Sequence, residues 1–166
     1  MITDDTITAI ATPVGSGGVG IIRISGDKAL QIASRVFNSA RGLSLNESVN
    51  NSFCYGYIYD DKGSKIDNGI ALVMKNPRSY TGEDTVELQC HGSTVILKQV
   101  LSSILNAGAR LAEPGEFSKR AFLNGRMDLT QAEGLYDLIR AKSDQAAKAA
   151  LEQLDGALKN RFNNLY

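Results

Sequence analysis

Short runs of branched, aromatic and alternating apolar residues predict a β-sheet in the first part of the chain. Each run is bounded by glycine, asparagine, aspartate or serine, the residues that favour turns. The predicted strands span residues 6–11, 19–25, 53–59, 66–74 and 85–90. Between the third and fourth runs, Asp60-Asp61-Lys62-Gly63 places a glycine where a tight turn needs a positive φ. These two strands are therefore a predicted hairpin.

Two further segments have the period of an amphipathic helix. In residues 27–37 the apolar positions fall mostly on one face, and residues 94–105 form a second predicted helix that ends before Ala107-Gly108. The polar residues 41–52 predict a loop. Strands and helices in this order predict an α+β domain, with a mixed or antiparallel sheet and packed helices, over residues 1–118.

The chain then predicts two helices joined by a defined turn. Pro114-Gly115 has turn chemistry, a run of helix formers follows it, and Asn124-Gly125 tolerates the left-handed conformation at a helix end. Asp128, with Gln131 three residues later, approximates a capping box at the start of the next helix. A joint of this kind can hold the side chain of Arg126 in a fixed direction.

Residues 119–166 predict the beginning of a helical domain, as one long amphipathic helix or a helix pair. Its apolar residues recur at spacings of three, four or seven and form a stripe on the helix surface. The stripe consists of Leu135, Ile139, Ala146, Ala150, Leu154, Leu158, Phe162 and Leu165. Because such a stripe needs a partner and little sequence follows it, we expect a fragment of a longer protein or burial in an oligomer.

The composition narrows the possible partners and compartments. Eighteen basic and eighteen acidic residues cancel, so any contact with nucleic acid is expected to be local or to lie elsewhere. No apolar run approaches the ~20 residues of a membrane helix, and the N-terminus lacks the basic start of a secretory signal. A cytosolic or organelle-matrix protein is expected. Cys54, Cys90 and His91 are too few for a disulfide framework or a metal site, so both thiols are predicted to be buried.

The glycine-rich segment of residues 15–20 formally matches a dinucleotide-binding fingerprint. A dinucleotide loop opens a helix whose N-terminus meets the pyrophosphate, whereas residues 19–25 predict a strand. The favoured interpretation is a glycine turn that lets the backbone approach a neighbour or a ligand. No segment matches Gly-x-x-x-x-Gly-Lys-Ser/Thr, so this sequence alone is not expected to hydrolyse GTP.

Other candidate catalytic groups lack the partners that chemistry requires. His91 has neither a Gly-x-Ser-x-Gly elbow nor a second histidine, so a hydrogen-bonded structural histidine is predicted. Glu83 and Asp84 are candidates for paired acids, but a solvated loop that leads into the strand is the favoured interpretation. No catalytic residue is assigned.

Three charged residues form the candidate ligand site. Alternation in residues 85–90 places Glu87 on the face opposite the apolar residues, Arg23 emerges from a predicted strand, and Arg126 emerges from the helix joint. Taken singly, each has the alternative interpretation of a surface charge. Together they suit a pterin, because a carboxylate accepts two parallel hydrogen bonds from its exocyclic amine and the adjacent ring nitrogen. Guanidinium groups suit its carbonyl and the carboxylates of its tail.

Five segments of the chain resemble the bacterial and organellar MnmE (TrmE) family of tRNA-modification GTPases. They are Ala11–Gly15, Gly17–Gly26, Ser79–Asp84, Glu113–Gly125 and Asp128–Glu133. The N-terminal domain of this family is similar to the tetrahydrofolate-binding domain of the glycine-cleavage aminomethyltransferase, and it binds a formylated tetrahydrofolate near a homodimer interface. The resemblance implies that residues 1–118 are a folate-binding and dimerisation domain and that residues 119–166 begin the helical domain.

The resemblance also implies the roles of the three charged residues. The family's folate-binding arginine, glutamate and basic residue correspond to Arg23, Glu87 and Arg126. The last of these is commonly lysine in the family, so in this chain a planar guanidinium group replaces a compact ammonium group. The implied cofactor is 5-formyltetrahydrofolate or a related tetrahydrofolate, whereas GTP, Mg and K belong to the family's GTPase domain.

The implied function of the whole protein is modification of the wobble uridine of certain tRNAs in the cytoplasm. The folate would supply a one-carbon unit, and the flavoprotein MnmG would be the partner for the redox step. Two alternatives stay open: a self-contained folate-dependent aminomethyltransferase-like enzyme, and a dimerisation scaffold without ligand. The short chain, with no second substrate domain, disfavours the first alternative.

Overall fold

One mixed sheet of seven strands organises the first part of the protein, in a computed structural model that describes residues 5–163 and their side chains as far as residue 155. The strands are β1 (Ile7–Ile10), β2 (Gly17–Ser25), β3 (Phe37–Ser39), β4 (Ser52–Tyr59), β5 (Lys65–Met74), β6 (Thr85–Gly92) and β7 (Arg110–Leu111). Their spatial order is β3-β4-β5-β6-β2-β1-β7. Neighbours are antiparallel except β1 and β7, which are parallel. The predicted α+β class with a mixed sheet is confirmed.

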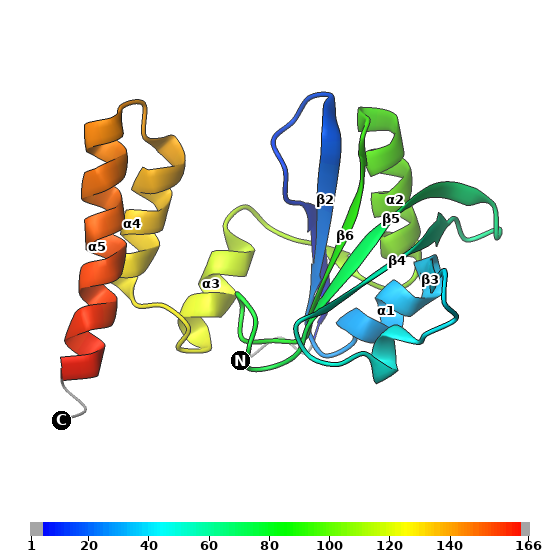
Figure 1. Ribbon diagram of the computed structural model, residues 1–166, viewed down its shortest axis with the longest axis horizontal. Helices are drawn as coiled ribbons and strands as arrows, with labels where there is room; N and C mark the ends of the chain where they lie inside the picture. Colours follow the sequence, from blue (N-terminus) through cyan, green and yellow to red (C-terminus); the bar gives the residue numbers. More distant parts are fainter. Residues whose placement is uncertain (1–4, 164–166) are drawn as a thin grey trace. The chain divides into compact units, whose positions relative to one another are not determined.

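Two helices, α1 (Ala29–Val36) and α2 (Thr94–Asn106), cover one face of this sheet (Figure 1). They share a hydrophobic core with alternate residues of the central strands. The contributions of β2 and β6 to that core include Ile22, Ile24, Val86 and Leu88, all fully buried. Because successive strand residues point to opposite faces, the residues between these four project from the other face.

The predicted hairpin between β4 and β5 is confirmed. Gly63 has a φ of +80°, the left-handed conformation for which glycine was expected. Asp60 stabilises the same turn, because its Oδ1 accepts the backbone N–H groups of Lys62 at 2.9 Å and of Ser64 at 2.7 Å.

Two short strands lie outside the predicted pattern. Phe37, predicted as the last residue of the first helix, instead begins β3 and pairs opposite Ile58 of β4. The two-residue strand β7 runs parallel to β1. Strands this short hold too few residues to show an alternation. A 3₁₀ turn, η1 (Leu45–Glu47), also interrupts the predicted loop.

The chain divides into two compact units, one ending at Phe117 and the other beginning at Ser118. Helix α3 (Glu116–Leu123) contains this boundary, and the second unit continues with α4 (Leu129–Arg140) and α5 (Asp144–Asn163). The predicted helical segment is therefore a pair. Among the described residues, no helix combines the length and the hydropathy that a bilayer crossing requires.

The joint between α3 and α4 has the predicted turn chemistry. Gly125, with a φ of +68°, follows the end of α3. Asp128 Oδ1 accepts the N–H of Gln131 at 2.8 Å, and Gln131 Oε1 accepts the N–H of Asp128 at 3.0 Å. The capping box is therefore confirmed, and it satisfies two N–H groups at the start of α4.

Candidate functional site

Arg23 and Glu87 lie directly opposite each other in the antiparallel register of β2 and β6. Residues paired in this way project from the same face of a sheet. The apolar residues of β6 are buried in the helix-covered core, so Glu87 and its partner project from the other face. The predicted placement of Glu87 opposite the apolar residues of its strand is confirmed.

The two side chains form an ion pair that leaves polar atoms available. Arg23 Nε donates to Glu87 Oε1 at 2.7 Å, and the side chains are 25% and 13% exposed, respectively. Within the part of the chain that the structure describes, Glu87 Oε2 and the Nη atoms of Arg23 have no hydrogen-bond partner. A carboxylate oxygen and guanidinium donors thus lie side by side, partly shielded from water.

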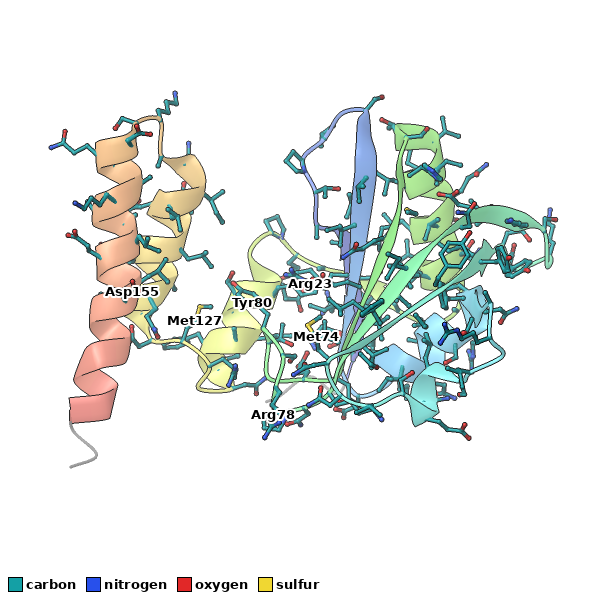
Figure 2. The ribbon with its side chains drawn as sticks, viewed as in Figure 1. Arg23, Met74, Arg78, Tyr80, Met127 and Asp155 are labelled. Atoms are coloured by element: carbon teal, nitrogen blue, oxygen red, sulfur yellow. The ribbon has the colours of Figure 1, made fainter. Side chains whose placement is uncertain are left out.

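Two aromatic rings pack on the Arg23 guanidinium group. Its central carbon lies 5.2 Å from the ring centroid of Tyr80 and 5.4 Å from that of Phe117. Figure 2 shows the Arg23 and Tyr80 side chains beside each other. Both distances are within the range of a cation–π contact. The sequence did not identify these two residues as parts of the site. Tyr80 lies in a loop and Phe117 in the first turn of a helix, and the hydrophobic period does not show such tertiary contacts.

A cluster of hydroxyl groups fastens the loop of residues 79–84 to β2. Ser25 Oγ lies 2.7 Å from Thr81 Oγ1 and donates to Glu83 Oε2 at 2.8 Å. Ser25 and Thr81 are fully buried. Asp84 Oδ1 accepts a backbone N–H at 2.9 Å. The predicted loop that leads into β6 is confirmed, and within it Glu83 and Asp84 are half-buried and accept hydrogen bonds.

Comparison with known proteins identifies the family of this chain. Residues 6–126, which include all three candidate ligand residues, match the family model described as GTP-binding protein TrmE N-terminus. The chain belongs to this TrmE family. It is 53% identical over 162 residues to the tRNA modification GTPase MnmE of Symbiobacterium thermophilum, an alignment that covers 98% of this chain and 35% of that relative.

Two other relatives give similar coverage. The tRNA modification GTPases MnmE of Streptococcus mutans and Clostridioides difficile are 49% and 50% identical to the chain over 166 and 165 residues. These alignments cover 99% of this chain and 36% of each relative. The TrmE-family chain therefore spans about a third of the length of the curated relatives it matches.

Arg126, the third candidate ligand residue of this TrmE-family chain, belongs to the second unit. It lies in the turn between α3 and α4, where its backbone N–H donates to the carbonyl oxygen of Ala121 at 2.8 Å. This bond and the positive φ of Gly125 fix the backbone from which the side chain starts. The structure brings Arg23 and Glu87 together, and the convergence of Arg126 with them stays a prediction.

His91 is held by an aspartate. Asp67 Oδ1 lies 2.8 Å from His91 Nδ1, and Asp67 Oδ2 accepts the backbone N–H of His91 at 2.9 Å. Burial alone would raise the pKa of Asp67, but the hydrogen bonds to His91 and to the backbone of Asn68, together with the charge of His91, leave this pKa below its ordinary value. The prediction of a hydrogen-bonded histidine is confirmed.

The two thiols differ in burial. Cys90 is buried as predicted, and its burial, together with the negative charge of Asp67, raises its pKa to about 11. Cys54 is only half-buried, which corrects the prediction for that residue, although burial raises its pKa as well. Both thiols are therefore protonated at neutral pH, the state in which a thiol is a poor nucleophile.

The glycine-rich segment leads into a strand, because β2 begins at Gly17. This order of elements differs from the strand, turn and helix of a dinucleotide-binding loop. Gly92 of β6 passes so close to β2 that a Cβ on it would lie 2.5 Å from the carbonyl oxygen of Gly17. The predicted close approach of this segment to a neighbouring backbone is confirmed, but residues 17–20 lie in β2 and not in a turn.

Proposed function

We propose that this chain is the folate-binding, homodimerising N-terminal part of a tRNA-modification GTPase. In this proposal residues 1–118 are the folate-binding and dimerisation domain, and residues 119–166, which contribute Arg126, begin a helical domain. The whole protein would act in the cytoplasm, where it would modify the wobble uridine of certain tRNAs with a folate-derived one-carbon unit. Membership of the TrmE family and the names of the relatives support the tRNA-modifying part of this proposal.

The proposal that the chain binds a folate rests mainly on the Arg23–Glu87 ion pair. Glu87 Oε1 is occupied by Arg23 Nε, while Oε2 accepts no hydrogen bond from the described residues. That oxygen can accept from the exocyclic amine or a ring N–H of a pterin, and the Nη groups of Arg23 can donate to a ring carbonyl. The donor set therefore fits a flat heterocycle with adjacent donors and acceptors.

The proposed roles are binding and orientation. Glu87 would fix the orientation of the pterin, Arg23 would bind its polar edge, and Arg126 would bind another polar group or the glutamate tail. Tetrahydrofolate supplies the one-carbon unit when it is bound. None of the three residues forms a covalent bond in this proposal.

An exposed apolar patch on β4 and β5 supports homodimerisation. Phe53 is 75% exposed, Tyr55 50% and Ile70 37%. Ile70 lies opposite Tyr55 on one neighbouring strand and opposite Gln89 on the other, so the patch continues toward the strand of Glu87. Apolar side chains grouped on one sheet face are typical of an interface, and we assign a second copy of this chain as the occupant.

The remaining partners are proposed for the whole protein. A GTPase domain would bind GTP with Mg and K, and the flavoprotein MnmG and tRNA would join in the complete complex. The formal net charge of zero supports a tRNA contact that is local or lies outside this sequence.

A titration of the 166-residue chain with 5-formyltetrahydrofolate tests the proposed site. Glu87→Gln keeps the shape of the side chain but removes its charge, so we expect affinity to fall by roughly 10- to 100-fold as charge-assisted hydrogen bonds are weakened. Glu47→Gln, at an exposed acid of η1, is the matched control and should bind like the unchanged protein. Equal affinity of the unchanged protein and the Glu87→Gln variant would reject the assigned role.

Sedimentation velocity tests the proposed interface separately. Tyr55→Lys places a charge within the patch and should convert a dimer to a monomer. Val95→Lys is the control, because Val95 is 64% exposed on α2, which covers the opposite face of the sheet. A Tyr55→Lys protein that sediments as the same dimer would exclude this patch as the interface.

A further inference from the structure

The aromatic contacts of Arg23 point to a role beyond the three residues assigned above. Arginine carries about 2 kcal/mol of side-chain conformational entropy, so a free Arg23 would adopt many orientations. Arg23 donates to Glu87 through Nε alone. A single hydrogen bond still allows the guanidinium plane to rotate. The rings of Tyr80 and Phe117, 5.2 Å and 5.4 Å from the guanidinium carbon, restrict that plane.

Tyr80 is held in place from the same strand as Arg23. Its neighbour Thr81 is fully buried and shares a 2.7 Å hydrogen bond with Ser25 Oγ, two residues after Arg23 on β2. The backbone N–H of Gly26 donates to the carbonyl oxygen of Asp84 at 3.0 Å. The loop of residues 79–84 is therefore joined by two hydrogen bonds to the end of β2, shortly after Arg23.

Phe117 is held by a second anchor. The preceding residue, Glu116, is buried, and its carboxylate receives Arg110 Nη1 at 3.1 Å and Nη2 at 2.6 Å. Glu116 Oε2 also accepts the N–H of Glu113 at 2.7 Å, which closes the turn before α3. A bidentate arginine–carboxylate pair has a defined geometry, so it fixes the first turn of α3, which includes Phe117.

We propose that Tyr80 and Phe117 are positioning residues whose rings restrict the orientation of the Arg23 guanidinium group, so that Arg23 and Glu87 present one preformed edge to the pterin. The proposal rests on the proposed function in naming the ligand, but the restraint on Arg23 exists without ligand. Preorganisation of this kind raises affinity because less side-chain entropy is lost on binding.

The restraint is measured first in the ligand-free protein. Nitrogen-15 NMR follows solvent exchange of the Arg23 Nε–Hε group, whose resonance is identified by its loss in Arg23→Lys. Tyr80→Leu removes a cation–π contact and should accelerate this exchange by roughly 3- to 30-fold, whereas Tyr80→Phe retains an aromatic ring and should leave it unchanged. If Tyr80→Leu misfolds, Phe117→Leu provides the same measurement. An unchanged rate in the folded leucine variants would overturn the proposal.

The second measurement is affinity for 5-formyltetrahydrofolate. Tyr80→Leu should weaken binding by roughly 3- to 30-fold and Tyr80→Phe should restore it. Tyr136→Leu is the matched control, because Tyr136 also packs on an arginine, Arg140 at 5.1 Å, but on α4. Tyr80→Leu binding with unchanged affinity would overturn the proposal. Absence of folate binding in the unchanged protein would instead reject the proposed function, and the exchange rates would still decide whether the rings restrain Arg23.

Discussion

The central strands β2 and β6 contribute residues of opposite character to the two faces of one sheet. Toward α1 and α2 they place fully buried aliphatic side chains, whereas toward the other face they place Arg23 and Glu87. The first set stabilises the fold through apolar area, which is non-directional. The second set depends on individual hydrogen bonds and ring contacts. We therefore expect substitutions on the two faces to separate stability from ligand binding.

The largest expected effect lies on the helix-covered face. Leu88 is fully buried, and Leu88→Ala should lower the free energy of unfolding by about 2–5 kcal/mol, because it removes buried methyl groups and leaves a cavity. Its neighbour Gln89 is half-buried on the other face, so Gln89→Ala is the control, with an expected loss of less than about 1 kcal/mol. Urea unfolding measures both. Equal losses would contradict the assigned difference between the faces.

A smaller effect with a defined pH dependence is expected at Asp67. Its pKa is lower in the folded chain than in the unfolded chain, so its ionised form stabilises the fold at pH values above the unfolded value of about 4. Asp67→Asn should lower the free energy of unfolding by about 1 kcal/mol near pH 6, because the amide that replaces the carboxylate is no longer a negatively charged hydrogen-bond acceptor.

That stabilisation is lost as pH falls through the folded pKa of Asp67. Urea unfolding should therefore show the difference between the unchanged protein and Asp67→Asn shrinking below about pH 4. Asp137→Asn, at an exposed aspartate of α4, controls for the loss of one charge. A difference that stays constant down to pH 2 would contradict the role assigned to the His91 contacts.

The smallest effect on stability is expected at the ligand pair. Arg23 and Glu87 are partly exposed, and ion pairs of that kind contribute little, so Glu87→Gln should change the free energy of unfolding by less than about 1 kcal/mol. Urea unfolding checks this value beside the folate titration. A loss of several kcal/mol would identify Glu87 as a structural residue and would remove the distinction between the faces.

The alternation of β6 was enough to predict the face on which Glu87 lies, because a strand has a strict two-residue period. Its pairing with Arg23 was not predictable in this way, since it depends on the register of strands whose paired residues are 64 positions apart. The contacts of Tyr80 and Phe117 depend on tertiary packing of a loop and a helix start. The burial expected for Cys54 failed because strand composition does not show which side chains a neighbour covers.

Local chemistry was the more reliable guide in the second unit. The capping box of Asp128 and Gln131 and the positive φ of Gly125 involve residues within a few positions of one another, so the sequence specifies them without tertiary information. The strands β3 and β7 illustrate the opposite case. Each is too short to show an alternation of apolar and polar residues, and each forms by pairing with the edge of a longer strand.

The central claim is that the Arg23–Glu87 pair is the place where a folate binds. Nitrogen-15 NMR of the arginine Nε–Hε groups, recorded while 5-formyltetrahydrofolate is added to the 166-residue chain, tests it most directly. We expect a saturable change in the Arg23 resonance, while the resonance of Arg35 of α1, on the helix-covered side of the sheet, stays unchanged. Saturable folate binding that leaves the Arg23 resonance unmoved would contradict it.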